Sequence, residues 1–306
     1  MLVRRVLRPG FALASAGLLL VGCAQTSSSS SSSSGPAQTS AAALTASESA
    51  SAASTLDVCS KENLTLLTPG TLTIGTDSPA YPPYFVDDDP TNGQGFESAV
   101  AYAVANTLGF ESNEVTWTVV PFNSSYAPGD KAFDFDINQI SITPKRKKVV
   151  DFSDGYYTVN QAVVALTDSP IANAKTNAEL QAAKLGAQIG TTSLEYINDV
   201  VKPAEQPYVY NDTNDAKSAL QNGQIDGIVV DLPTAYYITA AEIPKSKIVG
   251  QFPAVADGEQ FGMLFAKGNP LVNCVNKALA ELKDSGMLQQ IQDEWLAGET
   301  APYITE

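Results

Sequence analysis

Short segments in which apolar and polar residues alternate recur along the chain from about residue 70 onward. Alternation with a period of two is typical of half-buried strands. It predicts strands over residues 71–75 and 115–120, and apolar segments look like further strands over residues 133–142, 161–166, 185–189 and 227–230. Gly, Pro and Asn residues separate most of these segments, as expected for turns.

The segments between the strands carry a helical pattern. They predict helices over residues 97–108, 177–184, 193–200 and 215–222, and amphipathic helices over residues 278–295. Gly109 follows the first of these directly, where a helix commonly ends. Strands that alternate with helices predict an α/β fold with mainly parallel sheets. The folded part has about 250 residues, which suits two lobes better than one.

The N-terminus has a different pattern. Arg4, Arg5 and Arg8 precede an apolar stretch over residues 11–21. A basic start followed by a short apolar stretch is typical of a secretory signal. The stretch is shorter than the roughly 20 apolar residues that span a bilayer. We therefore predict a signal peptide over residues 1–22.

The end of this stretch reads Leu20-Val21-Gly22-Cys23, which resembles the lipobox of bacterial lipoproteins. The resemblance implies cleavage before Cys23 and acyl chains, such as palmitate, on that residue. The protein would then be held extracytoplasmically at the cell membrane by its N-terminal lipid. An ordinary signal peptide that happens to contain a Cys is the alternative.

Residues 24–56 consist almost entirely of Ser, Ala and Thr. Such a segment has no apolar face to bury. We predict that residues 23–56 form a disordered tether between the anchor and a folded domain that begins near Asp57.

The charge balance excludes several classes of function. The chain has 33 acidic and 18 basic residues, a net charge of −15, and no histidine. An acidic surface argues against nucleic acid as a partner, because nucleic-acid binding depends on Lys and Arg. Without histidine, a Ser-His-Asp triad and a His-ligated metal site are excluded. We expect a monomer with no metal and no cofactor.

The cysteine count suggests one disulfide. The chain has three Cys, and if Cys23 carries lipid, Cys59 and Cys274 remain as a pair. Outside the cytoplasm such a pair is expected to be oxidised. We predict a Cys59–Cys274 disulfide, with two buried free thiols as the alternative.

The segment from Ser141 to Tyr156 carries the most specific motif, Ser-Ile-Thr-Pro-Lys-Arg-Lys-Lys-Val-Val-Asp-Phe-Ser-Asp-Gly-Tyr. It resembles a segment of the family 3 bacterial solute-binding proteins, the ABC-importer receptors for polar amino acids. Other landmarks of that family occur in the same order: Ile74 to Asp77, Tyr81 to Pro83, Gly95 to Glu97, Gly190 to Ser193, and Asp226 to Asp231.

The resemblance implies a two-lobed, periplasmic-binding-protein-like α/β fold (type II) with a ligand cleft between lobes joined by two crossovers. By position, the first lobe comprises residues 57–158 plus 262–306, and the second comprises residues 159–261. The implied function is capture of a free amino acid by hinge closure and its delivery to the permease subunits of an ABC importer. No enzymatic activity and no catalytic residues are expected. A sensory amino-acid receptor lobe and a dehydratase on the same fold are the alternatives.

The charges of an α-amino acid indicate what its site must contain. Burying a carboxylate and an ammonium requires a partner for each, and the planar fork of Arg suits a carboxylate. Arg146 resembles the carboxylate-binding Arg of the family, although it also lies in the basic run of residues 145–148. In an open cleft its side chain would be partly solvated. Asp231, which follows an apolar strand, resembles the ammonium acceptor.

The remaining candidates come from the same resemblance. Thr192, with Thr191 beside it, lies before a helix and would donate to the carboxylate from the second lobe, although a plain helix cap is the alternative. The other expected ligand-binding residues are Ser141, Asn138, Gln139, Asp77, Tyr81 and Tyr84. A turn Asp and core Tyr residues are the alternatives for the last three. This lining offers no second cation, which speaks against an acidic ligand. Asp136 departs from the family, whose members carry apolar residues there.

Overall fold

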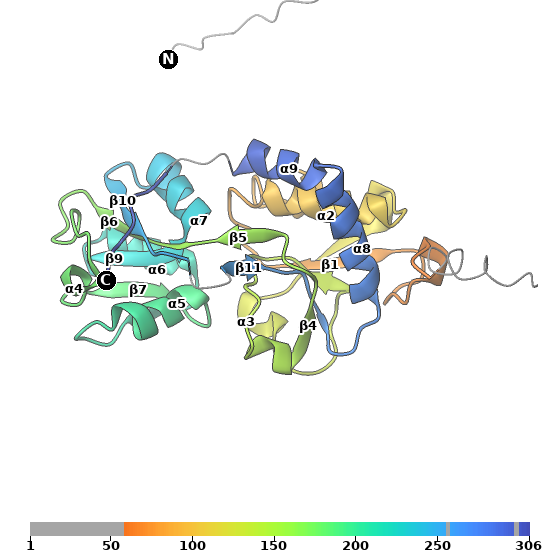
Figure 1. The fold of residues 1–306 in the computed structure, drawn as a ribbon, viewed down its shortest axis with the longest axis horizontal. Helices are drawn as coiled ribbons and strands as arrows, with labels where there is room; N and C mark the ends of the chain where they lie inside the picture. Colours follow the sequence, from red (N-terminus) through yellow and green to blue (C-terminus); the bar gives the residue numbers. More distant parts are fainter. Residues whose placement is uncertain (1–57, 255–257, 297–299) are drawn as a thin grey trace, which may run out of the picture. The chain divides into compact units, whose positions relative to one another are not determined.

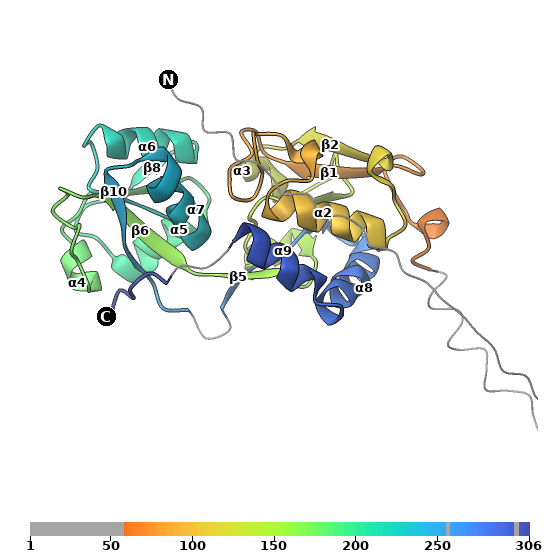
Figure 2. The same cartoon turned by 90° about the horizontal axis from the view of Figure 1, so that it is seen from above.

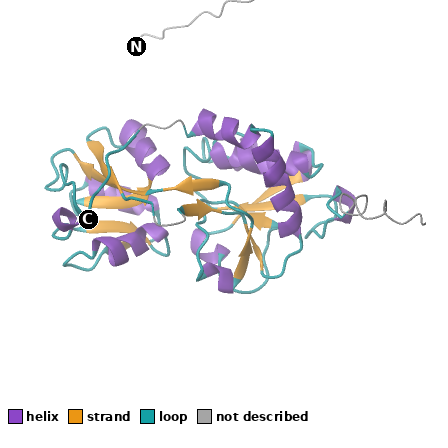
Figure 3. Ribbon diagram, in the orientation of Figure 1, coloured by secondary structure: helices purple, strands orange, loops and turns teal. Residues whose placement is uncertain are grey.

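The structure, a computed structural model, describes residues 58–254, 258–296 and 300–306 (Figure 1). These residues belong to one compact unit. The predicted signal peptide, Cys23 and the tether lie outside the described residues. In the described part, helices lie beside the strands of two five-stranded sheets (Figure 3). The predicted α/β class is therefore confirmed.

The first sheet has the strand order β2-β1-β3-β12-β4. Its strands are β1 (Leu72–Thr76), β2 (Val115–Val119), β3 (Phe135–Asp136), β4 (Val150–Phe152) and β12 (Leu264–Ala266). Helices α2 (Phe96–Thr107), α8 (Leu271–Asp284) and α9 (Met287–Trp295) pack on one another beside it (Figure 1). Short helix α3 (Phe122–Ser125) lies next to a smaller apolar cluster that contains Phe122, Phe133 and Leu264. We call this assembly the first lobe.

The second sheet has the strand order β10-β6-β9-β7-β8. Its strands are β6 (Gln161–Leu166), β7 (Leu185–Gln188), β8 (Tyr208–Tyr210), β9 (Gly227–Asp231) and β10 (Ser246–Gln251). The helices that accompany it are α4 (Asn177–Leu180), α5 (Thr192–Tyr196), α6 (Thr213–Gln221) and α7 (Leu232–Tyr237). Wider π turns extend α5 over Ile197–Val201 and α7 over Ile238–Glu242. We call this assembly the second lobe.

The sequence of β6 explains why helices cover both faces of the second sheet. Val163 and Ala165 belong to one buried cluster, whereas Ala162 and Val164 belong to another. Successive side chains of a strand point to opposite faces. An uninterrupted apolar run therefore requires cover on both sides.

Both sheets are mixed, whereas mainly parallel sheets were predicted. In the first sheet β1 pairs in parallel with β2 and β3, but β12 runs antiparallel to β3 and β4. In the second, β6 runs antiparallel to β9 and β10. A parallel neighbour requires a long crossover connection. β6 and β12 instead continue almost directly from strands that connect the lobes, so they enter each sheet without such a crossover.

Two paired strands connect the lobes. β5 (Tyr157–Val159) and β11 (Glu259–Phe261) pair antiparallel, and they run side by side in both views (Figures 1 and 2). They correspond to the two expected crossovers.

The C-terminal residues differ from the expected boundary, which placed residues 262–306 in the first lobe. Ile304 is 1% exposed within a core cluster of the second lobe, and the Ile304 amide donates to the Gln251 carbonyl at 2.8 Å. An apolar residue near the chain end thus secures the tail to the second sheet.

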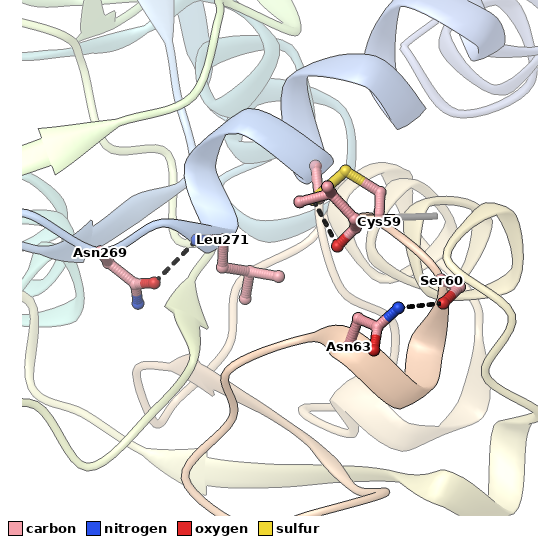
Figure 4. The surroundings of a disulfide bond; sticks show 7 residues. Cys59, Ser60, Asn63, Asn269 and Leu271 are labelled. Carbon is pink, nitrogen blue, oxygen red and sulfur yellow. Dashed lines mark hydrogen bonds between the residues drawn. A yellow bond between two sulfur atoms is a disulfide. The ribbon is translucent and has the colours of Figure 1, made fainter. Parts of the chain in front are cut away.

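A disulfide joins Cys59 to Cys274, as predicted, with a Cα–Cα distance of 5.3 Å (Figure 4). Cys274 lies in α8 and is 4% exposed. The bond links residues 215 positions apart in the sequence. In the chain-entropy model, a disulfide that closes a loop of that length adds on the order of 4–5 kcal/mol to the free energy of unfolding, because it restricts the unfolded chain. It attaches the start of the described chain to the helical layer of the first lobe.

Several local expectations were wrong. The strand predicted over residues 133–142 is reduced to two residues, because Gln139 adopts φ +47° and the chain leaves the sheet. Helix α7 and strand β10 were not predicted.

Among the residues that the structure describes, no helix is long and apolar enough to cross a membrane.

Candidate functional site

A cavity opens where strands of both sheets end. Its walls come from the carboxyl ends of β1 and β3 in the first lobe and of β7 and β9 in the second. This is the edge at which open α/β sheets bind ligands. The cavity measures about 70 Å³, several times the roughly 10–15 Å³ that one water molecule needs. It is lined by Asp77, Tyr81, Phe122, Asn138, Gln139, Ala187, Gln188, Thr191, Thr192, Ser193, Thr213, Ala216, Val229, Val230, Asp231 and Thr234.

Seven of the ten expected ligand-binding residues lie on this wall, namely Asp77, Tyr81, Asn138, Gln139, Thr191, Thr192 and Asp231. The other three, Tyr84, Ser141 and Arg146, are not among the lining residues. All three are nonetheless buried, at 0%, 1% and 7% exposure. Tyr84 lies in the core of the first lobe, and its hydroxyl accepts a 3.4 Å hydrogen bond from Thr234, a lining residue.

Asp77 and Tyr81 form the wall near the end of β1. Asp77 accepts hydrogen bonds from the amides of Ser78 at 2.8 Å and Phe122 at 3.0 Å. Burial raises its pKa, and the nearby Asp212 and Asp88 carboxylates add to the effect. The Lys217 ammonium of the second lobe lies 5.3 Å from the Tyr81 ring centre. The carboxylates of Asp77, Asp88 and Asp212 thus gather near this part of the wall, with the Lys217 ammonium beside Tyr81.

Glu97, in the first turn of α2, fixes the part of the wall that follows β3. It is fully buried and accepts hydrogen bonds from the backbone and side-chain amides of Gln139 and from the Tyr156 hydroxyl. Burial raises its pKa to about 7 despite these bonds. They hold Gln139 in its left-handed conformation. Asn138 then faces the cavity with its Nδ2 buried and without a hydrogen-bond partner among the described residues.

The two threonines at the start of α5 have different roles. Thr191 is the helix cap, because its hydroxyl accepts from the Leu194 amide at 3.2 Å and donates to the Gln188 carbonyl at 2.7 Å. Thr192 has no part in this capping. Its hydroxyl lies 3.4 Å from that of Ser141 in the first lobe. The cap interpretation thus applies to Thr191 and leaves Thr192 available to the cavity.

Asp231 belongs to a network that continues to the connection between the lobes. Gln161 Nε2 donates to Asp231 Oδ1 at 2.6 Å and lies 3.2 Å from both carboxylate oxygens of Glu259. Ser141 Oγ donates to Glu259 Oε1 at 2.5 Å. Burial, followed by the neighbouring Glu259 carboxylate, holds the pKa of Asp231 well above its usual range.

Arg146 lies at the contact between the lobes, beside the cavity wall at Thr191. Its Nη1 donates to the Ser141 carbonyl at 2.7 Å and its Nη2 to the Gly190 carbonyl of the second lobe at 2.9 Å. The guanidinium carbon lies 4.9 Å from the Tyr126 ring centre and 5.4 Å from that of Phe122. Gly190 has φ +76°, and a Cβ there would lie 2.2 Å from the Tyr126 hydroxyl. A side chain at position 190 would therefore prevent this approach.

The charged side chains of this region, the buried Arg146 and the half-buried Asp231 and Glu259, lack protein partners of opposite sign. Within the described ranges, no carboxylate lies within 4.0 Å of Arg146 and no cation within 4.0 Å of Asp231 or Glu259. A buried charge without a counter-ion is unfavourable. The region thus provides one unpaired cation and, separately, unpaired anions beside a polar cavity. That arrangement is complementary to a molecule with one carboxylate and one ammonium.

Comparison with known proteins supports this interpretation. Residues 72–298 match the profile of the bacterial extracellular solute-binding proteins, family 3. The chain belongs to this family. The match covers both lobes and confirms the resemblance found in the motif around Arg146.

Named relatives of the chain are binding proteins, which confirms the prediction of an extracytoplasmic solute-binding protein rather than an enzyme. The L-cystine-binding protein TcyJ of Escherichia coli K12 is 28% identical over 232 residues, covering 75% of this chain and 84% of the relative. The arginine-binding extracellular protein ArtP of Bacillus subtilis is 29% identical over 233 residues, covering 74% and 87%. A solved structure of an ancestral arginine-binding protein bound to arginine has 31% identity and a TM-score of 0.63, covering 74% and 98%.

Within the family, Asp136 remains a departure without a structural explanation. It lies in β3 opposite Gly75, is fully buried, and has no hydrogen-bond partner for either carboxylate oxygen among the described residues. Burial, with Glu97 and Asp77 nearby, holds its pKa well above the usual range. It is not a lining residue of the cavity, and we assign it no role.

Two residues of the site, Gln161 and Glu259, were not predicted from the sequence. Gln161 and Glu259 connect Asp231 to Ser141, and Ser193 donates to Gln161 Oε1 at 2.7 Å. Gln161 opens an otherwise apolar strand and is fully buried. A polar side chain at the start of a buried strand was the available signal. Glu259 had no such signal, because only the fold brings it to Gln161.

Proposed function

We propose that this chain binds one free amino acid in the cavity between its lobes and delivers it to the permease subunits of an ABC importer. The observation that carries the proposal is a set of unmatched charges, the buried Arg146 on one side and the half-buried Asp231 and Glu259 on the other. The α-carboxylate would pair with Arg146, where two carbonyl hydrogen bonds now occupy the guanidinium. The α-ammonium would pair with Asp231. Thr192 would donate to the carboxylate from the second lobe.

The lining favours a neutral polar or cationic side chain. It contains the carboxylates of Asp77 and Asp231 but no Lys or Arg, so an acidic side chain would meet repulsion. Asp77, with Asp212 and Asp88 nearby, offers a partner for a positive group. L-Arginine is therefore the first ligand to test, in keeping with the names of ArtP and of the ancestral protein bound to arginine.

Closure of the lobes on the ligand follows from where its partners lie. Arg146 and Ser141 belong to the first lobe, whereas Thr192 and Asp231 belong to the second. Only an arrangement that brings the lobes together satisfies both charges of the amino acid, so the ligand favours the closed state. β5 and β11 are the segments about which such closure would occur. The loaded, closed form would be the one that the permease recognises.

The thermal stability of the folded domain, measured with each of the twenty standard amino acids and L-cystine, tests this function. A ligand at 100 times its dissociation constant adds about 2.7 kcal/mol to the free energy of unfolding. We expect a clear rise in melting temperature with at least one polar or cationic amino acid and none with aspartate or glutamate. No shift with any member of the panel would contradict the proposed function.

We also propose that Cys23 carries the lipid that holds the protein at the membrane, and that residues 23–56 tether the folded domain to it. The proposal rests on the sequence of residues 1–23, which lie outside the described part of the chain. Each buried CH₂ of an acyl chain contributes about 0.8 kcal/mol to membrane binding, and stable anchoring requires two chains or one chain plus a second signal.

Replacing Cys23 tests the anchor separately from ligand binding. We expect Cys23→Ser to move the protein from the membrane fraction to the medium or the soluble fraction, because no acyl chain can then be attached. Amino-acid binding by the released protein should be unchanged. A Cys23→Ser protein that still sediments with membranes would show that another segment provides the attachment.

Two other functions use the same cavity differently. A sensory receptor lobe would bind the amino acid equally well but report to a membrane kinase, and the presence of importer genes beside this one would favour transport. A dehydratase would convert a prephenate-like substrate. The unmatched pair of one cation and separate carboxylates fits an amino acid better, and a turnover assay distinguishes the two.

A further inference from the structure

Two carboxylates share one amide donor beside the cavity. Asp231 ends β9 and lines the cavity, whereas Glu259 lies on β11, the strand that returns to the first lobe. Gln161 Nε2 lies within 3.2 Å of both side chains. An amide nitrogen has only two hydrogens, whereas two ionised carboxylates present about eight acceptor sites. Gln161 therefore cannot satisfy both groups when both are ionised.

The surroundings add more negative than positive charge. The titratable groups that act on Asp231 are Glu259 on β11, Glu97 on α2, Tyr84 before α2, Tyr157 on β5 and Arg146 in the turn Arg146–Lys148. Only Arg146 is positive, and it lies beyond 4.0 Å. When two carboxylates are close in a poorly solvated site, one of them holds a proton more strongly. Burial and the neighbouring Glu259 carboxylate raise the pKa of Asp231, so Asp231 holds a proton more strongly than an isolated carboxyl group does.

The same cavity contains an unsatisfied hydrogen-bond donor. Asn138, 6% exposed, faces it with an Nδ2 that has no partner among the described residues. A buried amide donor without an acceptor is unfavourable. An occupant that brings both an acceptor for Asn138 and a donor for the carboxylates would satisfy both groups.

We propose that Glu259 is the second carboxylate of the ammonium subsite, and that the primary ammonium of the ligand replaces the proton that Asp231 holds beside Glu259. This inference rests on the proposed function and identifies which group of the amino acid sets that part of the specificity. The ammonium enters with all three of its hydrogens, and the displaced proton leaves to the solvent. A nitrogen that is acylated or fully substituted cannot make this exchange.

Because a proton leaves when the ammonium binds, the affinity for the ligand depends on pH. Below the raised pKa of Asp231 this carboxyl group holds a proton, which competes with the ligand. Above that pKa Asp231 is ionised and ready to accept the ammonium. The affinity should therefore rise as the pH increases through that raised pKa, by up to about tenfold per pH unit for one released proton. Under acidic conditions near pH 5 the affinity should be lowest.

Calorimetry of the wild-type protein tests the exchange without any substitution. The probe is L-arginine, or another amino acid if the panel above selects it. Titration at pH 7 in phosphate and in Tris, which differ in ionisation heat, gives the number of protons released. We expect release of about half a proton to one proton per bound amino acid. Equal apparent heats in the two buffers would overturn the proposal.

The variant Glu259→Gln assigns the effect to this residue. It retains the size of the side chain and its hydrogen bonds to Ser141, but it removes one charge. We expect affinity at pH 7 to fall by about tenfold or more, and most of the proton release to disappear. Glu281→Gln, an exposed change of the same kind on α8, should alter neither quantity. Wild-type proton release and affinity in Glu259→Gln would show that Glu259 only supports the connecting strands. Absence of any amino-acid binding by the wild type would instead contradict the proposed function.

Discussion

Replacing Arg146 with alanine is expected to weaken amino-acid binding by some 30-fold to several thousand-fold. Removing one partner of a buried charge pair typically changes the binding free energy by roughly 2–5 kcal/mol, since the other charge is left unpaired. Arg146 is 7% exposed and has ring and carbonyl contacts but no carboxylate within 4.0 Å among the described residues. The ligand carboxylate would be its counter-ion. Calorimetric titration of wild type and variant measures the difference.

The adjacent residue provides the control. Lys145 is 86% exposed, and its 3.8 Å ion pair with Glu195 is of the exposed kind that contributes little. Lys145→Ala should therefore bind almost as wild type does. Arg146→Lys should restore only part of the affinity, because an ammonium lacks the planar fork that makes two parallel bonds. Equal losses in Arg146→Ala and Lys145→Ala would mean that Arg146 acts only as part of the basic run.

The change Asp231→Asn should produce a loss of similar size through the opposite charge. Asparagine has nearly the same shape and its Oδ1 can still accept from Gln161, so the network around it should survive. The ligand ammonium would lose its charged partner, again at about 2–5 kcal/mol. The exposed Asp215 on α6 allows a matched change, Asp215→Asn, which should leave binding intact. An Asp231→Asn protein with wild-type affinity would remove this carboxylate from the ammonium subsite.

The fold was predictable where the spacing of apolar residues along a segment determines which of its side chains are buried. The apolar runs of β6 and β9 and the apolar face of α8 identify their elements, because each pattern requires cover on particular faces. The direction of each strand within its sheet was not predictable. It depends on how the chain enters the sheet, whereas the spacing of apolar residues is the same in parallel and antiparallel strands. The attachment of Ile304 to the second lobe is likewise a long-range contact with no local signal.

The site was predictable to the extent that a short motif holds its residues. The segment from Ser141 to Tyr156 identified Arg146 and, through the family, Thr192 and Asp231. The environment of Arg146 was not predicted: only partial solvation in an open cleft was expected, whereas the side chain packs beside the rings of Phe122 and Tyr126 and reaches the Gly190 carbonyl. Gln161 and Glu259 were missed because only the pairing of distant strands brings them to Asp231.

The central claim is that the cavity holds a free amino acid by both of its charges at once. Calorimetric titration of the wild-type protein with L-arginine, with agmatine, which lacks the carboxylate, and with Nα-acetyl-L-arginine, which lacks the ammonium, tests it most directly. If the panel selects another amino acid, its decarboxylated and acetylated forms take their place. We predict tight binding of the amino acid and losses of at least about 30-fold for each derivative, as expected when one buried charge lacks its partner. Affinities within a few-fold of one another for all three compounds would contradict the account.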